Sequence, residues 1–179
     1  MELSSVLPLI YLLALTAVLG VIGLLVFREV MRNRRQEGVI SRLQGRLAKG
    51  KGTPEEHYEL GSVYLEKKLY DLAIAQFRKA IDVAEEDIPV VCNAMGYTYF
   101  LQEQYDLAIR FYKSAVEAER DYATAWNNLA HAYEKKNLIG QAVEAYETAL
   151  AIDPDSDIAK RRSTSLRKRL SPTGSAAEK

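Results

Sequence analysis

The feature of this sequence that most restricts its fold is a pattern of large and small residues that recurs about every 34 positions. The clearest copy covers residues 123–156 and places in order Trp126, Leu129, Ala130, Tyr133, Ala142, Tyr146, Ala149 and Pro154. These positions follow the 3.6-residue period of two helices with a break near Asn137. The pattern predicts a helical hairpin in which the small residues let the two backbones approach closely.

Two further copies precede this hairpin. Gly96 lies 34 residues before Ala130, and Gly61 lies 35 residues before Gly96. The other positions recur as Leu60, Tyr64, Ala73, Phe77 and Ala80, and as Met95, Tyr99, Ala108, Tyr112 and Ala115. Because one hairpin cannot bury its apolar faces alone, the three copies predict an all-α stack, an α-solenoid. The spacing resembles the tetratricopeptide repeat, with three repeats expected within 53–156, at 54–88, 89–122 and 123–156.

A long uncharged segment precedes the repeats. Residues 6–27 contain no Asp, Glu, Lys or Arg, and as a helix they would span roughly 33 Å at about 1.5 Å per residue. Since the hydrocarbon core of a bilayer is about 30 Å thick, the segment predicts a transmembrane helix in contact with lipid. A cleaved signal peptide would instead have a basic start, a shorter apolar run and a small-residue cleavage site, and none of these features is found here.

The next segment, residues 28–52, is a basic neck. It contains eight Lys or Arg, including Arg28, Arg32, Arg34 and Arg35, against two Glu. Basic residues beside a membrane span stay on the cytoplasmic side, or on the stromal side in a plastid, so we expect a single-pass protein with its repeats there. Two interpretations stay open: an amphipathic helix whose four named arginines face anionic lipid, or a solvated spacer.

The repeat region has the opposite charge to the neck. Residues 53–159 contain twenty Asp or Glu and nine Lys or Arg, a net charge of −11 in a chain that is neutral overall. A surface of this sign repels nucleic acid, which excludes nucleic acid as a partner. It favours basic protein surfaces within the distance of about 8 Å that screening by physiological salt allows.

The first helix of each repeat lines the concave side of such arrays, which indicates where a protein partner would bind. The candidate residues are Tyr58, Asn93, Tyr97, Asn127 and His131. The asparagines can hydrogen-bond the backbone of an extended peptide, and the tyrosines offer flat amphipathic contacts. The alternative interpretation is that these residues form ordinary half-exposed helix faces.

No catalytic or metal-binding arrangement is recognisable in the sequence. His57 and His131 lie far apart, and no Cys, His or carboxylate cluster has the spacing of metal ligands. Phosphate-binding glycine loops and a Ser, His and Asp arrangement are missing as well. The single cysteine, Cys92, and His57 stand at the repeat position of Trp126, where packing is their expected role. We therefore expect no enzyme, no cofactor and no small-molecule substrate.

The C-terminal segment is again basic. Residues 157–170 contain six Lys or Arg, and Ile158, Leu166 and Leu170 recur at spacings of eight and four. This pattern predicts a polar capping helix that covers the last hairpin, with a basic surface for lipid or an acidic partner. Residues 171–179 are expected to form a disordered tail.

The order of anchor, basic neck, repeats and basic cap resembles one known family. The resemblance covers about Leu7 to Leu170 and rests on these segments: PLIYLLALTAVLG, SRLQGRLAKGKGTPEEHYELGSVYLEKKLYDLAIAQF, EQYDLAIRFYKSAV, AWNNLAHAYE and KRRSTSLRKRL. They look like the thylakoid tetratricopeptide proteins of cyanobacteria and plastids that are involved in photosystem I assembly. The resemblance implies a non-enzymatic scaffold in the thylakoid membrane that binds photosystem I subunits or assembly intermediates.

Two other functions fit the same pattern. One is a membrane-anchored receptor for targeting peptides or chaperones, and the other is an accessory subunit of another membrane complex. Chaperone-binding members of the repeat family hold a C-terminal carboxylate with Lys and Arg on the concave side. Here Tyr58, Ser62 and Thr124 stand where such residues would be wanted, which disfavours a chaperone tail as the ligand.

The predicted topology can be tested with a protease. When protease is added to the cytoplasmic or stromal side of intact membranes, it should digest the repeats, because the basic neck keeps them on that side. Immunoblotting against the repeats measures their loss, and a lumenal protein that stays intact shows that the membranes are sealed. Repeats that survive until detergent is added would reverse the topology.

Overall fold

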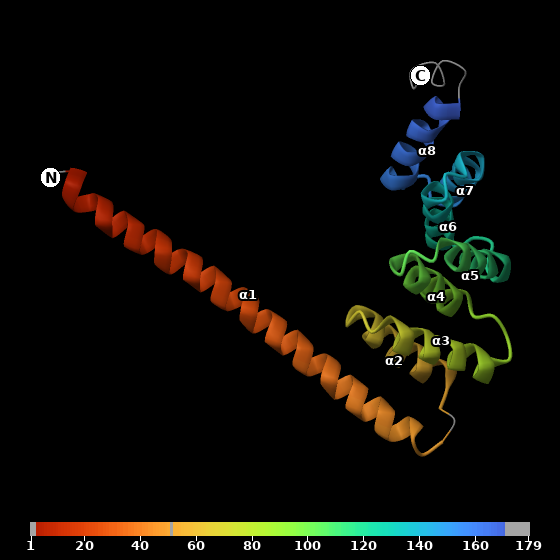
Figure 1. Cartoon of the computed structure of the whole chain (residues 1–179), viewed down its shortest axis with the longest axis horizontal. Coiled ribbons are helices and arrows are strands. Elements are labelled where there is room, and N and C mark those ends of the chain that lie inside the picture. The colour runs from red at the N-terminus through yellow and green to blue at the C-terminus, as the bar shows by residue number, and fades with distance from the viewer. Residues whose placement is uncertain (1–2, 51, 171–179) are drawn as a thin grey trace. The chain divides into compact units, whose positions relative to one another are not determined.

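The computed structural model describes residues 3–50 and 52–170, with side chains from Pro8 onward. In this part of the chain every regular element is an α-helix (Figure 1). The helices are α1 (Leu3–Leu47), α2 (Pro54–Glu66), α3 (Tyr70–Ala84), α4 (Pro89–Leu101), α5 (Tyr105–Ala118), α6 (Ala123–Lys135), α7 (Ile139–Ile152) and α8 (Asp157–Leu170). The predicted all-α class is confirmed, whereas the tail expected at 171–179 lies outside the described residues.

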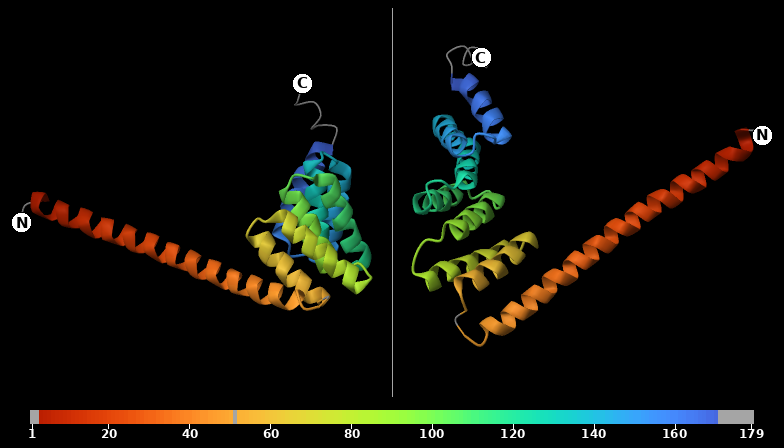
Figure 2. Two further views of the ribbon diagram at one scale, coloured as in Figure 1. Left: turned by 60° about the horizontal axis from the view of Figure 1, so that its bottom comes forward. Right: turned by 180° about the vertical axis from the view of Figure 1, so that it is seen from behind.

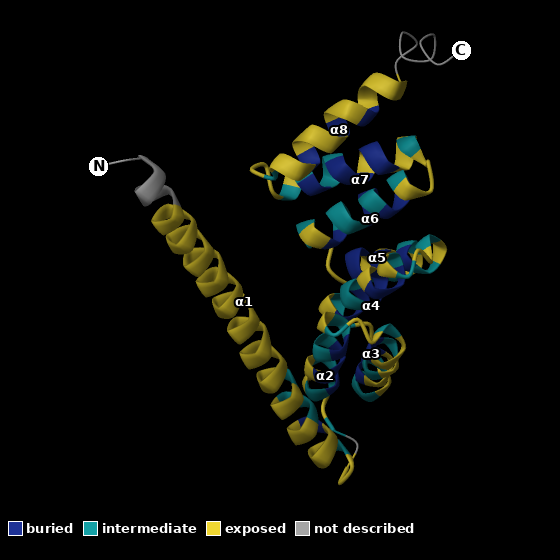
Figure 3. Ribbon diagram, turned by 60° about the vertical axis from the view of Figure 1, so that its left-hand side comes forward, coloured by how far each residue is buried: buried dark blue, intermediate teal, exposed yellow. Residues whose placement is uncertain are grey.

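α1 is one helix that continues from the uncharged segment through most of the basic neck. Its 45 residues extend for about 67 Å at about 1.5 Å per residue, more than twice a bilayer core of about 30 Å. The large apolar side chains from Leu9 to Phe27 are 50–68% exposed, and Figure 3 shows this part of α1 exposed on all sides. By length and composition, α1 is able to cross a membrane.

Each hairpin buries an aromatic ring of its second helix, and in the first two hairpins this ring meets a glycine of the first helix. Phe77, Tyr112 and Tyr146 are at most 1% exposed. A Cβ atom added to Gly61 would lie 2.6 Å from the Phe77 ring, and one added to Gly96 would lie 2.6 Å from the Tyr112 ring. Larger residues at these two glycines would therefore force the helices apart.

The turn inside each hairpin has the same conformation three times. Lys68, Glu103 and Asn137 have φ values of 60°, 60° and 57°, in the left-handed region. The next residue donates its backbone N–H at 2.9 Å to a carbonyl five positions earlier, in the pairs Leu69 to Tyr64, Gln104 to Tyr99 and Leu138 to Tyr133. This is the Schellman motif, which satisfies the last carbonyls of a helix. The repeated turn gives the three hairpins the same reversal of direction.

The hairpins stack on one another in chain order (Figure 2). The first helices α2, α4 and α6 are neighbours in one layer, and the second helices α3 and α5 each also pack against the first helix of the next repeat. Polar links recur where one repeat meets the next, since Gln102 donates to Asp71 at 3.2 Å and Lys136 pairs with Asp106 at 3.0 Å. We call α2 to α8 together the repeat array.

α8 caps the repeat array by packing on α7. Its buried face consists of Ala159, Ser163 and Leu166, and Arg162 pairs with Glu134 of α6 at 2.9 Å. The predicted cap is confirmed, but its expected apolar stripe is wrong in part, because Ile158 and Leu170 are 61% and 54% exposed. The small residues Ala159 and Ser163 set the packing face, and they allow the close approach that larger side chains would prevent.

The hairpin packing predicts the cost of one added side chain. Ala73 is completely buried in α3, so Ala73→Leu should overpack the hairpin and lower its stability by about 1–3 kcal/mol. Ala75, two residues away on the same helix, is exposed, and Ala75→Leu should change stability by less than about 0.5 kcal/mol. Denaturant unfolding of the detergent-solubilised chain, followed by circular dichroism, measures both. Equal effects would contradict the packing described here.

Candidate protein-interaction surface

The layer of first helices carries all five candidate binding residues. Tyr58 belongs to α2, Asn93 and Tyr97 to α4, and Asn127 and His131 to α6. Tyr58, Asn93 and Asn127 occupy one repeat position, and Tyr97 and His131 occupy the position four residues later. Because α2 neighbours α4 and α4 neighbours α6, these equivalent positions lie on one face of the array. Tyr97 is 44% exposed and the other four are half-buried. We call this face, defined by the five residues, the inner face.

Asn93 forms a hydrogen-bonded link between two repeats. Its Oδ1 accepts from Asn128 Nδ2 at 2.9 Å, and its own Nδ2 donates to the Tyr122 hydroxyl at 3.4 Å. Burial raises the pKa of Tyr122, and the nearby Tyr58 adds to this shift. The amide of Asn93 therefore stabilises the packing of α4 against α6. A peptide bound at Asn93 would either compete with these hydrogen bonds or add to them.

Sequence reasoning did not identify Tyr122 and Asn128 as part of this face. Tyr122 is the residue just before α6, in the turn between repeats, so the helical period does not reveal where it lies. Asn128 follows Asn127 directly, and only the tertiary structure shows which of the two amides reaches Asn93. The one signal in the sequence was the pair of adjacent asparagines.

Asn127 differs from Asn93 because its Oδ1 is buried without a hydrogen-bond partner among the described residues. An unsatisfied buried acceptor costs about 1–3 kcal/mol. A donor supplied from outside the chain, such as a backbone N–H of a peptide or a basic side chain, would remove this cost. Asn127 is therefore the member of the inner face whose side-chain oxygen would gain most from a donor, and a partner's donor reaches this buried atom only when neighbouring side chains move.

His131 is held by an aromatic neighbour. Its ring centroid lies 4.8 Å from that of Phe100, in a tilted arrangement. Burial lowers the pKa of His131, and Arg162 and Lys135 lower it further, against the opposing effect of the Glu134 carboxylate. His131 is thus neutral near pH 7, with one ring nitrogen that donates and one that accepts.

Two tyrosines give the inner face its apolar contact area. The Tyr58 ring lies 5.9 Å from that of Phe77, which ties it to the core of the first hairpin. Tyr97 is the most exposed of the five candidate residues. An aromatic ring fixed at its base and exposed at its edge can bury apolar surface of a partner with little loss of side-chain freedom.

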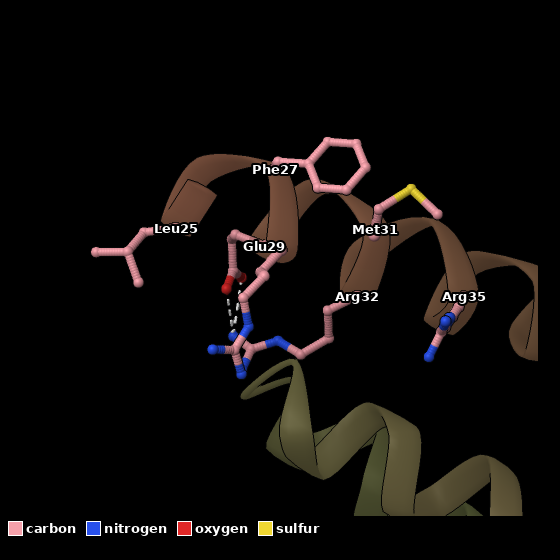
Figure 4. A pocket seen from close by; sticks show the side chains of 7 residues that line it. Leu25, Phe27, Glu29, Met31, Arg32 and Arg35 are labelled. Carbon is pink, nitrogen blue, oxygen red and sulfur yellow. Dashed lines mark hydrogen bonds and ion pairs between the residues drawn. The ribbon is translucent and has the colours of Figure 1, made fainter. Parts of the chain in front are cut away.

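The four arginines proposed to face lipid, Arg28, Arg32, Arg34 and Arg35, are all exposed on α1. Arg32 pairs with Glu29 at 2.7 Å. Figure 4 shows Arg32 and Arg35 pointing to the opposite side of the helix from Phe27 and Met31. The hollow of about 660 Å³ drawn there is lined by α1 alone, and the surface of one helix cannot enclose a small molecule.

The positions considered for chemistry are used for packing. The described residues contain no group of three or more His, Cys, Asp or Glu that could hold a metal ion. Cys92 is completely buried, and burial together with Asp87 raises the pKa of its thiol to about 12. His57 is 4% exposed, and its Nδ1 lies 2.9 Å from Gln76 Oε1. The predicted packing role of both residues is confirmed.

Comparison with family models and solved structures shows to which class of protein this chain belongs. The family described as tetratricopeptide repeat matches residues 57–87 and 123–156, and the family described as TPR repeat matches 96–137. The crystal structure of MamA aligns with a TM-score of 0.71 over 75% of this chain and 78% of that chain, at 21% identity. The first TPR of Spaghetti (RPAP3), bound to an HSP90 peptide, aligns at 0.62 over 65% and 92%, at 23% identity. The chain is a tetratricopeptide repeat protein, a class of protein-interaction scaffolds.

Relatives in sequence narrow this class to one family. The uncharacterized protein ycf37 of Cyanophora paradoxa is 34% identical over 81% of this chain and 86% of its own length. The corresponding values for ycf37 of Guillardia theta are 31%, 94% and 97%. PYG7, a chloroplastic tetratricopeptide repeat domain-containing protein of Arabidopsis thaliana, is 36% identical over 94% of this chain, which spans 56% of that protein. The chain belongs to the ycf37 family.

The hydrogen bonds of the inner face predict opposite effects for two asparagines. Asn93→Ala leaves Asn128 and Tyr122 without their shared partner and should lower stability by about 1–3 kcal/mol. Asn127→Ala removes an unsatisfied acceptor and should leave stability unchanged or raise it. Urea unfolding of the full chain in detergent compares the two variants. A greater loss for Asn127→Ala than for Asn93→Ala would contradict the assignment.

Proposed function

We propose that this protein is a membrane-anchored scaffold that promotes the assembly or stability of photosystem I in the thylakoid membrane. The observation that carries the proposal is the family relationship, which extends over nearly the whole chain and so includes α1 as well as the repeat array. A relative described as chloroplastic supports a photosynthetic setting. The photosystem I role itself follows from the resemblance described for the sequence.

The proposed anchor is supported by the surface of α1. The side chains from Leu9 to Phe27 expose large apolar areas that water solvates poorly, whereas lipid tails solvate them well. The arginines after Phe27 would lie among lipid headgroups, each contributing about 1 kcal/mol of attraction to an anionic surface. This arrangement keeps the repeat array on the cytoplasmic or stromal side.

Anchoring explains how a modest binding surface can act as a scaffold. A partner embedded in the same membrane meets the array at a high effective concentration, so a weak inner face is sufficient. The inner face offers Tyr58 and Tyr97 for apolar contact and, in Asn127, a buried acceptor that lacks a partner among the described residues. These groups fit an extended segment of a photosystem I subunit or assembly intermediate better than they fit a carboxylate, which needs cationic donors.

The proposal predicts a specific defect in a photosynthetic host. Removing the chain should lower photosystem I relative to photosystem II, as measured by low-temperature fluorescence emission, and the full chain should restore the ratio. A chain without residues 6–27 should fail to restore it. The double change Tyr97→Ala and Asn127→Ala should restore it poorly, whereas Leu72→Ala, on the exposed side of α3, should restore it fully.

The same strains separate this proposal from its alternatives. Photosystem I subunits should purify with the tagged full chain from solubilised membranes, and less so with the Tyr97 and Asn127 double variant. A normal photosystem ratio in the deletion strain would refute the proposal. Purification with a chaperone or with another membrane complex would instead favour the receptor or the accessory subunit.

A further inference from the structure

A groove lies on the repeat array away from the inner face, between α5 and α7 with α6 as its floor. It measures about 700 Å³, and its apolar lining includes Val116, Leu129, Ala145, Tyr133 and Trp126. Trp126 is the single tryptophan of the chain. Its indole Nε1 donates to the backbone carbonyl of Arg120 at 2.9 Å, which fixes the ring at one end of the groove. We call this the outer groove.

The preceding repeat shows which group is missing from the outer groove. There Phe111 stacks on Tyr99, with the ring centroids 5.3 Å apart and the planes 7° from parallel. The equivalent positions of the third repeat lie 34 residues later. Tyr133 is equivalent to Tyr99, whereas Ala145 is equivalent to Phe111. The third repeat thus keeps the ring on which a phenyl group stacks but lacks the phenyl group. The Phe111 ring of the second repeat therefore shows what kind of group a ligand of the third repeat would supply.

The Tyr133 ring is 7% exposed at the groove, and a movable side chain from the neighbouring repeat lies over it. The Nζ atom of Lys113 lies 6.0 Å from the centre of the ring, and Lys113 is exposed. An exposed lysine changes rotamer within picoseconds to nanoseconds, so it can move aside. A bound aromatic ring that stacks on Tyr133, as Phe111 stacks on Tyr99, would replace the cation–π contact of Lys113. The stacked ring buries more apolar surface than the lysine does.

The two rims of the groove carry opposite charges. On the α5 side the rim residues are Lys113 and Glu117 of α5 and Arg120 of the turn that follows it, with a net charge of one positive. On α7 they are Gln141, Glu144 and Thr148, with a net charge of one negative. A segment that lies in the groove therefore binds best with a carboxylate toward α5 and a basic group toward α7.

We propose that the outer groove binds a protein segment that inserts one phenylalanine or tyrosine side chain between Tyr133 and Ala145. The inserted ring takes the place that Phe111 has in the second repeat. A carboxylate of the same segment contacts Lys113, and a basic residue on its other side contacts Glu144. Because this surface is separate from the inner face, the array can hold two partners, or two parts of one partner, at once.

Trp126 provides a direct measurement of binding. The probe is a short synthetic peptide without tryptophan that carries a central Phe flanked by one Glu and one Lys, added to the full chain in detergent micelles. We expect a saturable change in Trp126 fluorescence, and at least about tenfold weaker binding when the central Phe is replaced with Ala. Equal titrations with the two peptides, or no saturable change up to millimolar concentration, would refute the proposal.

Variants test whether the response comes from the outer groove. Ala145→Phe supplies the missing ring from within the chain, as Phe111 does, and should abolish the response to the Phe peptide. The matched control is Ala151→Phe, an exposed position on the same helix, which should bind like the unchanged chain. Circular dichroism confirms that each variant folds. A folded Ala145→Phe chain that binds normally would overturn the site.

A charge change tests the proposed orientation of the bound segment. Lys113→Glu should weaken binding of the peptide at least about tenfold, because it places like charges together. A second peptide, with Lys in place of Glu on that flank, should regain the lost affinity with the same variant. Equal loss for both peptides, or no loss for either, would contradict the proposed orientation.

Discussion

The whole array depends on how closely the two helices of each hairpin approach. Gly61 and Gly96 leave room for the rings of Phe77 and Tyr112, and even one Cβ atom at either glycine would come within 2.6 Å of those rings. Because protein interiors are close-packed, this distance sets the separation of the paired helices. The separation in turn sets how one repeat lies on the next, and so which side chains reach the inner face and which reach the outer groove. Both proposed binding surfaces are therefore consequences of hairpin packing.

Small differences between otherwise equivalent repeats give the array its individual surfaces. Asn93 binds Asn128 and Tyr122, a link that exists because α4 and α6 are neighbours. Where the second repeat has Phe111 the third has Ala145, and the Lys113 side chain lies over the Tyr133 ring. These differences between repeats leave the buried alanines of the hairpins in place, since Ala108 and Ala142 are both 0% exposed. A repeat fold can thus vary its partners at a few positions while its core stays the same.

α1 and the repeat array differ in the burial of their apolar residues. The array buries its apolar residues among its own helices, whereas α1 leaves residues 9–27 uncovered in the described structure. A helix that is apolar on every side is stable only in apolar surroundings, such as a protein core or a lipid bilayer. The two parts also differ in charge, since the array is acidic and the neck is basic.

The sequence by itself determined the helices, the three hairpins and the cap, because the spacing of Gly61, Gly96 and Ala130 and the apolar period around them admit few other structures. It also placed Cys92 and His57 in the core. It did not determine which of two adjacent asparagines would reach Asn93, that Tyr122 would join them, that Ile158 would stay exposed, or that Ala145 would leave a groove beside Trp126. Those outcomes depend on contacts between residues about 30 positions apart, which helical periodicity cannot describe. Only the stacking of complete hairpins decides them, since it fixes which side chains from different repeats come within reach of one another.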